Sequence, residues 1–373
     1  MPVGSQIIKI EIFKFEIPLR EIVRIAVGSR STTDNILIRV HTADGLYGMG
    51  ESSVSAGYSS GENQPIALEA AKGLARLLVG QDSTHIERLH QIMDAFLWRN
   101  ATIKSGFDIA LYDLLGKRLG IPLYTLFGGQ KRVIETDLTI GLESFEKTAE
   151  KAREIQLQGF RAIKLKFGTN RKDDVGRARA AREAVGREMA LRGDANQGWD
   201  PGEAPRILHE LEQFELEYCE EPVKHWNNDA MRRVREQTTI PIVADESIFD
   251  HHDALRLVRI DACDYFNIKL AKSGGFFKAL KVNAIAEAAG MRCSIGCKLE
   301  SRLGLTAAAH LSSALTNIVY NDLDSALALS LDPVIGGITY RGGQITLPDE
   351  PGLGADIDPD VLKKLEVVAI TAE

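Results

Sequence analysis

Residues 160–168 read FRAIKLKFG, and the interpretation of the whole chain starts from this stretch. In an extended strand, residues two apart point to the same side, so Lys164 and Lys166 share one face while the apolar residues between them share the other. An edge strand with two solvated lysines is the ordinary explanation of such a pattern. The alternative is a polar interior that carries out chemistry, because a buried ammonium group needs a partner.

The composition argues against two classes of protein. With 373 residues the chain is long enough for a large core and more than one domain. A net charge of -7 argues against a nucleic-acid binder, and no apolar run approaches the ~18 residues of a membrane helix. The N-terminal stretch lacks the pattern of a signal peptide. We therefore expect no nucleic-acid or membrane partner.

Four cysteines lack paired CxxC spacing, which is typical of free thiols in a cytosolic protein: Cys219, Cys263, Cys293 and Cys297. We therefore expect a cytoplasmic location. We also expect a homo-oligomer, whose order the sequence does not give.

The expected elements form two units and a tail. Strands over 7–55 and helices over 65–120 suggest an α+β domain covering residues 1–130. From residue 134 short apolar strands alternate with amphipathic helices, and a helix follows each of the first seven strands. The eight expected strands are 135–141, 160–168, 190–196, 216–222, 241–247, 265–270, 291–297 and 317–324. They predict an α/β fold, a (β/α)8 TIM-type barrel over 131–325, with the tail 326–373 returning to the capping domain.

Polar residues end the expected strands at a regular interval. From Lys166 the steps to Asp194, Glu220, Asp245 and Lys269 are 28, 26, 25 and 24 residues, which is one βα unit each. Active sites of such barrels lie at the carboxyl ends of the strands. The recurrence at one level makes scattered surface charge a poor explanation, so we expect a functional interior.

Three of these residues are carboxylates on adjacent strands, namely Asp194, Glu220 and Asp245. They would repel one another unless a cation lay between them. Oxygen ligands without His or Cys favour Mg²⁺, with Mn²⁺ as the alternative. Helix capping could explain either aspartate singly, but Glu is a poor cap.

The lysines suggest proton transfer. The second and sixth strands face each other in an eight-stranded ring, so Lys166 and Lys269 would lie on opposite sides of a substrate whose carboxylate binds the metal. Lys164 beside Lys166 would lower its pKa by like-charge repulsion and help to neutralise that carboxylate. The metal would stabilise the enediolate formed when the α-proton leaves. Two opposed bases predict racemisation or epimerisation by 1,1-proton transfer.

Five motifs together resemble the enolase superfamily, in its muconate-lactonising subgroup: KLK at 164–166, DANQGW at 194–199, CEEP at 219–222, ADES at 244–247 and NIKLAKSGG at 267–275. The resemblance covers nearly the whole chain. It implies a modified enolase-type barrel with a capping domain. It also implies Lys166 and Lys269 as the acid/base pair and Asp194, Glu220 and Asp245 as metal ligands, with Glu220 chosen over its neighbour Glu221.

The last strand indicates the substrate. Asp322 and Asp324 lie on one face of the eighth strand, across the barrel from the metal, where they could bind an ammonium group. A carboxylate at one end and an ammonium at the other describe a dipeptide, and this DxD motif also resembles that of dipeptide epimerases. The alternative for both aspartates is loop capping. The expected function is a Mg²⁺-dependent dipeptide epimerase that inverts the α-carbon of the C-terminal residue of an L,L-dipeptide.

Three alternatives stay open. An N-acylamino acid racemase, or a lyase resembling muconate cycloisomerase or o-succinylbenzoate synthase, would use the same fold. A non-catalytic binding barrel would not need the lysines. The lyase alternative leaves Asp322 and Asp324 without a clear role.

The sequence gives neither the preferred dipeptide nor the physiological pathway. The resemblance implies that enzymes acting on Ala-Glu place an arginine of the first lid loop near the glutamate, and Gly28 stands there in our best register. Leu299 offers no acid to a cationic substrate, so we favour a small first residue and an apolar second one. Lys298 is either a solvated rim residue or a group that attracts an acidic side chain. Thr139 is either a substrate donor or a structural residue.

Overall fold

The eight parallel strands that the alternating pattern predicts form one sheet in the computed structural model, which describes residues 4–54 and 61–372. Each strand pairs in parallel with the next, in chain order from β7 to β14. The strands are β7 Leu138–Ile140, β8 Ala162–Lys166, β9 Ala190–Asp194, β10 Leu216–Glu220, β11 Ile242–Ala244, β12 Tyr265–Ile268, β13 Arg292–Gly296 and β14 Ile318–Asp322. The sheet curves into a nearly closed barrel, so the predicted barrel fold is confirmed.

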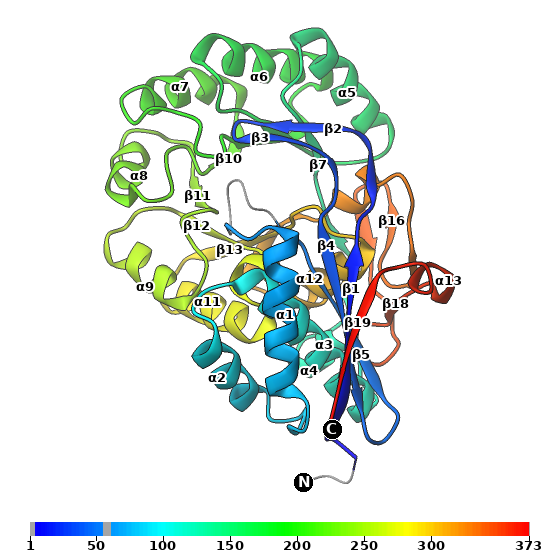
Figure 1. The fold of residues 1–373 in the computed structure, drawn as a ribbon. Helices are drawn as coiled ribbons and strands as arrows, with labels where there is room; N and C mark the ends of the chain where they lie inside the picture. The colour runs from blue at the N-terminus through cyan, green and yellow to red at the C-terminus, as the bar shows by residue number, and fades with distance from the viewer. Residues whose placement is uncertain (1–3, 55–60, 373) are drawn as a thin grey trace.

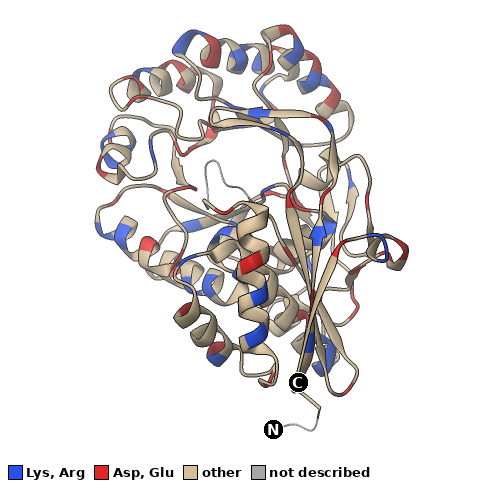
Figure 2. Cartoon of the chain, viewed as in Figure 1, with Lys and Arg blue, Asp and Glu red and all other residues tan. Residues whose placement is uncertain are grey.

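Helices cover the outside of this barrel (Figure 1). They are α5 Phe145–Leu157, α6 Arg171–Val185, α7 Ala204–Leu211, α8 Asn228–Arg235, α9 His251–Arg259, α11 Phe276–Ala288 and α12 Arg302–Ala314, with the short α10 Leu270–Ser273 and the 3-10 turns η1 Glu212–Phe214 and η2 Ser325–Ala328. Acidic and basic residues are interspersed along the outer helices, as Figure 2 shows for α5 and α6. The charge runs in this part of the sequence are therefore solvated helix faces.

The first expected strand is split in two. Ile134–Glu135 forms β6 and pairs with β17, whereas only Leu138–Ile140 joins the barrel as β7. Asp137, between the two pieces, is buried and accepts a hydrogen bond from Arg192 at 2.9 Å. A buried ion pair thus separates segments that the sequence pattern joins.

The capping domain is an antiparallel sheet covered by helices. Its strand order is β19-β1-β4-β5, with β1 Ile7–Phe15, β4 Asn35–Thr42, β5 Tyr47–Ser52 and the C-terminal β19 Val367–Thr371. The helices are α1 Gln64–Leu78, α2 Ile86–Phe96 and α3 Ala101–Leu119. A Cβ at Gly50 would lie 2.0 Å from the Gly106 carbonyl oxygen, so glycine lets α3 pack directly on β5.

The rest of the tail forms small elements. These are β15 Val334–Gly336 with β18 Ala355–Ile357, β16 Thr339–Arg341 with β17 Gln344–Thr346, and the single turn α13 Pro359–Leu362. Another single turn, α4 Leu123–Leu126, follows α3. We propose the division 1–130, 131–325 and 326–373 as the domain boundaries, although residues 1–3 and 373 lie outside the described part. Within that part, no helix combines the length and the apolar character needed to cross a bilayer.

Buried carboxylates of the capping domain bind the N-termini of barrel helices. Glu51 of β5 accepts hydrogen bonds from the backbone N–H groups of Ser301 and Gly304, both at 3.0 Å, where α12 begins. Asp108 of α3 accepts from the backbone N–H of Phe276 at the start of α11. A negative group at a helix N-terminus satisfies unpaired N–H groups and the helix dipole. These contacts fix the capping domain above the barrel mouth.

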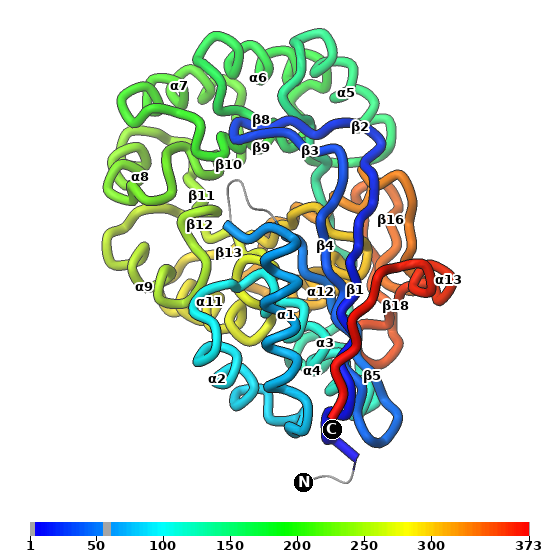
Figure 3. The backbone as a smooth tube through the Cα atoms, in the orientation of Figure 1, coloured from blue at the N-terminus to red at the C-terminus, as the bar shows by residue number. Residues whose placement is uncertain are grey.

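A hairpin of the capping domain crosses that mouth. It consists of β2 Pro18–Ile25 and β3 Gly28–Thr32, and its tube passes over β8 and β9 in Figure 3. The Leu142 N–H donates to the Arg24 carbonyl at 3.0 Å, and the Lys151 ammonium pairs with Glu21 at 2.9 Å. The hairpin is thus attached to the barrel on the side of α5 and forms a lid.

Candidate active site

The residues that end the barrel strands meet at one level. Lys166 of β8 is register partner of Asp194 of β9, which is in turn the partner of Glu220 of β10. Asp245 directly follows β11, and Lys269 directly follows β12. The structure therefore brings these five residues together as the spacing predicts.

Each carboxylate of this group is paired with a lysine at 2.6 Å. Lys166 Nζ binds Asp194, Lys164 Nζ binds Glu220, and Lys269 Nζ binds Asp245. The Lys164 side chain is 1% exposed and that of Lys166 is 13% exposed. The interpretation of residues 160–168 as an edge strand with solvated lysines is therefore wrong, because both lysines of β8 lie inside the barrel.

The three carboxylates fit a hard divalent cation. All three are buried, and no His or Cys belongs to the set. Asn267 donates to Glu220 at 2.8 Å, while its own Oδ1 is buried without a hydrogen-bond partner. Buried carboxylate and amide oxygens, without nitrogen or sulfur donors, are the ligands that Mg²⁺ prefers.

A second group of metal-binding side chains lies nearby. One donor atom each of Cys297, Asp322 and Asp324 lies within 4.8 Å of the others. In this group Asp322 binds Lys164 at 2.8 Å, and Asp324 accepts the Thr139 N–H at 2.7 Å. Burial also raises the pKa of the Cys297 thiol well above its usual range. We assign no metal to this group.

The pKa values of the site depend on two effects, the burial of each group and the charges of its neighbours. Burial, together with the charge of Asp194, raises the pKa of Glu220 to about 7. Burial has the largest single effect on the pKa of Lys166 and lowers it, but the charges of Asp194 and Glu220 act in the opposite direction, and the net pKa is raised. The expected lowering by Lys164 is present, but it does not decide the net pKa of Lys166. Like-charge repulsion is present, but the carboxylate 2.6 Å away is stronger.

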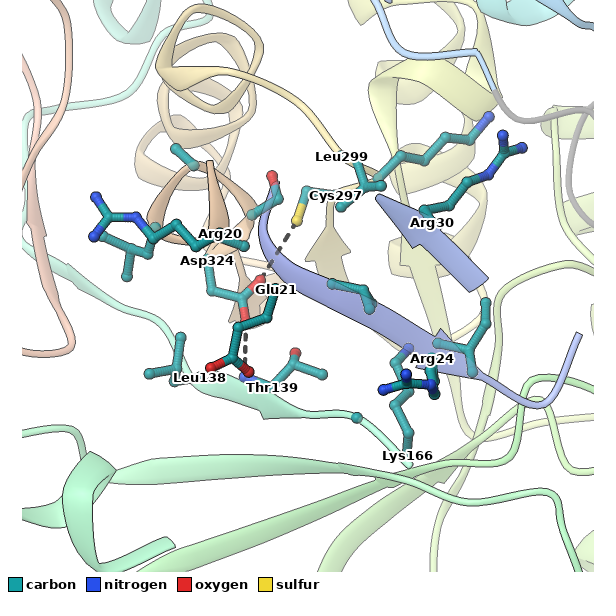
Figure 4. A pocket seen from close by; sticks show the side chains of 18 of the residues that line it. Arg20, Glu21, Arg24, Arg30, Leu138, Thr139, Lys166, Cys297, Leu299 and Asp324 are labelled. Carbon is teal, nitrogen blue, oxygen red and sulfur yellow. Dashed lines mark hydrogen bonds between the residues drawn. The ribbon is translucent and has the colours of Figure 1, made fainter. Parts of the chain in front are cut away.

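A cavity of about 920 Å³ separates this site from the lid. Lys166, Lys269, Lys298, Asp322 and Asp324 all line it, whereas Lys164 does not. Figure 4 shows Arg24 of the lid near Lys166, and Asp324 between Thr139 and Cys297. The cavity is thus lined by both cationic groups and carboxylates.

Lys298 and Thr139 both line the cavity. Lys298 is 6% exposed, so the solvated alternative is wrong. Burial, partly offset by Glu62, lowers its pKa to about 8. Thr139 lines the cavity, and its backbone N–H holds Asp324.

Sequence reasoning missed several residues that support the ligands. The fully buried Lys272 donates to Asp245 Oδ1 at 2.6 Å, and Glu221 accepts the Asp245 N–H at 2.7 Å. Asn196 and Glu221 adopt positive φ angles of 42° and 37°, which are unusual for residues other than glycine and often mark functional sites. A second lysine three residues after Lys269, within one helical turn, was the signal that could have found Lys272.

Comparison with known proteins agrees with this geometry. Residues 7–128 match the N-terminal domain of the mandelate racemase / muconate lactonizing enzyme family, and residues 147–361 match the enolase C-terminal domain-like family. The chain is 41% identical to D-Ala-D/L-Ala epimerase of Cytophaga hutchinsonii over 98% of this chain and 99% of that protein. It is 38% identical to hydrophobic dipeptide epimerase of Enterococcus faecalis over 91% of this chain and 96% of that protein.

Solved structures show the same relationship. The dipeptide epimerase of Cytophaga hutchinsonii, crystallised with Mg and the dipeptide D-Ala-L-Val, superposes with a TM-score of 0.96 at 41% identity and covers 98% of this chain and 100% of its own. Muconate lactonizing enzyme of Pseudomonas fluorescens has a TM-score of 0.92 at 31% identity, with 96% and 98% covered. With both domains matched and the site in place, the chain belongs to the mandelate racemase / muconate lactonizing enzyme family of the enolase superfamily.

Proposed function

We propose that this protein is a Mg²⁺-dependent dipeptide epimerase that inverts the α-carbon of the C-terminal residue of an L,L-dipeptide. One observation carries the proposal: a single cavity is lined by the two lysines Lys166 and Lys269 and also by the two carboxylates Asp322 and Asp324. The similar proteins named as dipeptide epimerases, one of them crystallised with Mg and a dipeptide, support it.

Asp194, Glu220 and Asp245 are the residues that would hold the metal. When bound, Mg²⁺ supplies positive charge beside the substrate carboxylate and so makes the α-proton more acidic. Burial of the three carboxylates in the barrel strengthens this electrostatic effect by excluding water.

Lys166 and Lys269 would exchange the proton. Each comes from a different side of the barrel, because β8 and β12 are four strands apart in the sheet. One lysine, as the neutral amine, removes the α-proton and leaves the electron pair on the substrate. The other, as the ammonium ion, returns a proton to the opposite face of the α-carbon. Roles reverse for the reverse reaction, which makes the two lysines an acid/base pair.

Lys164 would act without touching the substrate. It does not line the cavity, and its ammonium binds Glu220 at 2.6 Å and Asp322 at 2.8 Å. We propose that it holds one metal ligand and one substrate-binding carboxylate in place and contributes positive charge to the site.

Asp322 and Asp324 would bind the amino terminus of the dipeptide. Both are buried in the lining of the cavity, and the Thr139 N–H fixes Asp324. Two carboxylates within reach of one ammonium group provide charge-assisted hydrogen bonds. A substrate with an acylated nitrogen carries no ammonium group for these carboxylates to bind, which disfavours N-acylamino acids.

The cavity favours an apolar second residue. Its lining includes apolar side chains from the lid, the barrel loops and the turn after β14: Ile22, Val23, Ile25, Val27, Leu138, Ile140, Leu142, Leu299 and Leu327. We therefore propose a dipeptide with a small first residue and an apolar second one. Lys298, also in the lining, is the group that would attract an acidic side chain instead.

The test is mass spectrometry of a pooled L,L-dipeptide library incubated with enzyme and Mg²⁺ in D₂O. A gain of one mass unit in particular dipeptides, abolished by a chelator, would support the function and name the substrates. If no dipeptide exchanges while an N-acylamino acid does, the dipeptide assignment is wrong. The homo-oligomer and the cytoplasmic location stay predictions, testable by light scattering and by cell fractionation.

A further inference from the structure

Lys272 is a fully buried lysine that the proposed mechanism does not use. It lies in α10, three residues after Lys269, and its side chain is 1% exposed. Its ammonium group donates to Asp245 Oδ1 at 2.6 Å, to the Asn267 carbonyl at 2.9 Å and to the backbone carbonyl of Asp245. All three N–H donors of the ammonium group are therefore occupied.

Two lysines divide the Asp245 carboxylate between them. Lys272 binds Oδ1, whereas Lys269 binds Oδ2 at 2.6 Å. Lys269 lines the cavity, but Lys272 does not. Lys272 cannot reach a substrate, so any effect on the reaction must pass through Asp245 or Asn267.

The arrangement has a consequence for proton transfer. Lys269 must turn from Asp245 to the substrate, and Asp245 then loses its contact on Oδ2. Lys272 still binds Oδ1 and the Asp245 backbone, so the carboxylate keeps a counterion and its orientation. A buried carboxylate with no counterion costs folding free energy, and without a hydrogen-bond donor it would not keep one orientation.

We propose that Lys272 is a positioning residue that holds Asp245 in place as a metal ligand and lets Lys269 leave it for the substrate. The inference rests on the proposed function. It assigns Lys272 a role in Mg²⁺ affinity, beyond that of an ion pair that only stabilises the barrel.

Lys104 offers a matched control. Its side chain is also 1% exposed, and its ammonium binds Asp94 at 2.7 Å and the Leu97 carbonyl. It belongs to α3 of the capping domain and lies outside the cavity lining. Lys104→Met therefore removes an equally buried ammonium group, whose partner Asp94 is 41% exposed, without touching the proposed metal ligands.

The experiment is titration calorimetry of Mg²⁺ into metal-free enzyme, without substrate, on wild type, Lys272→Met and Lys104→Met. We expect Lys272→Met to weaken Mg²⁺ binding about 10- to 100-fold, the usual effect of removing a group that orients a ligand. Lys104→Met should keep the wild-type affinity at a lowered melting temperature. Lys272→Arg, which keeps the charge and donors, should recover part of the affinity.

A second readout separates positioning from stability. In D₂O, Lys272→Met should slow α-proton exchange at the face served by Lys269 more than at the face served by Lys166. Wild-type Mg²⁺ affinity in Lys272→Met would overturn the inference, and so would an equal loss in Lys104→Met. If Lys272→Met does not fold, the same titration on Lys272→Gln decides. A wild-type enzyme that neither binds Mg²⁺ nor exchanges α-protons would instead refute the proposed function itself.

Discussion

Replacing Asp324 by Asn should weaken dipeptide binding while leaving the fold at least as stable. Asp324 is buried in the lining of the cavity, and its Oδ2 accepts the Thr139 N–H at 2.7 Å. The Asn side chain keeps an oxygen for this contact and loses only the negative charge. The substitution therefore separates the proposed binding of an ammonium group from loop capping, which needs an acceptor but no charge.

The effect on binding follows from one charge-assisted hydrogen bond. Such a bond contributes about 1.5–3 kcal/mol. Because each ~1.4 kcal/mol is a factor of ten, we expect KM for dipeptides to rise roughly 10- to 100-fold. The metal and both proposed bases are untouched, so kcat should change less than KM.

The effect on stability has the opposite sign. Burial, together with the charge of Asp322, raises the pKa of Asp324 from 3.8 to about 6. An acid whose pKa is raised on folding costs folding free energy above that pKa, and the cost disappears as pH falls towards the ordinary value. A rise of about two units corresponds to about 3 kcal/mol at pH 7. Asn carries no charge, so the melting temperature should stay or rise.

The same pKa predicts the pH profile. The ionised carboxylate binds the ammonium group, so kcat/KM should fall as pH falls through about 6 in the wild type, and Asp324→Asn should lack this contribution. Steady-state kinetics from pH 5 to 8 and thermal melts test both effects. Asp332→Asn is the control, since Asp332 also lines the cavity but is paired with Arg302. An unchanged KM with a lowered melting temperature would refute the reasoning and return Asp324 to loop capping.

Three further predictions follow from the geometry. Lys166→Ala or Lys269→Ala should abolish epimerisation, yet each should still exchange the α-proton of one diastereomer in D₂O through the remaining lysine; exchange of both diastereomers by either variant would contradict the two-base scheme. Chelation with EDTA should abolish activity and leave the circular dichroism spectrum intact, because the three ligand carboxylates keep their lysine partners at 2.6 Å; Mg²⁺ should restore activity. Glu51→Ala should lower the free energy of unfolding by roughly 3 kcal/mol in urea denaturation, because buried N–H groups at the start of α12 lose their acceptor; Glu51→Gln, which keeps one acceptor oxygen, should lose less.

The architecture could be predicted because it depends on local periodicity. A barrel strand and its helix take one unit of about 25 residues, so polar residues that recur at this interval must lie at one level. Five residues could therefore be selected without knowledge of side-chain packing: Lys166, Asp194, Glu220, Asp245 and Lys269. Three neighbouring carboxylates repel one another, and this repulsion indicated that a cation lies among them.

Other features depend on contacts between residues far apart in the chain. The contact of Glu51 with α12 spans 250 residues, and the burial of Lys298 beneath the capping domain follows from the same domain docking. The hydrophobic pattern of 135–141 reads as one strand, but the buried pair of Asp137 and Arg192 divides it. No pattern within the sequence specifies such pairings.

The sequence by itself determined the barrel, the level of the site and the chemical types that meet there, because spacing and alternation are properties of the local chain. Only the tertiary structure decided which lysine binds which carboxylate, and hence that the pKa of Lys166 is raised and that Lys272 supports Asp245. Electrostatic energy inside a protein depends on distances of a few ångströms and on the exclusion of water, and both are set by how distant segments pack.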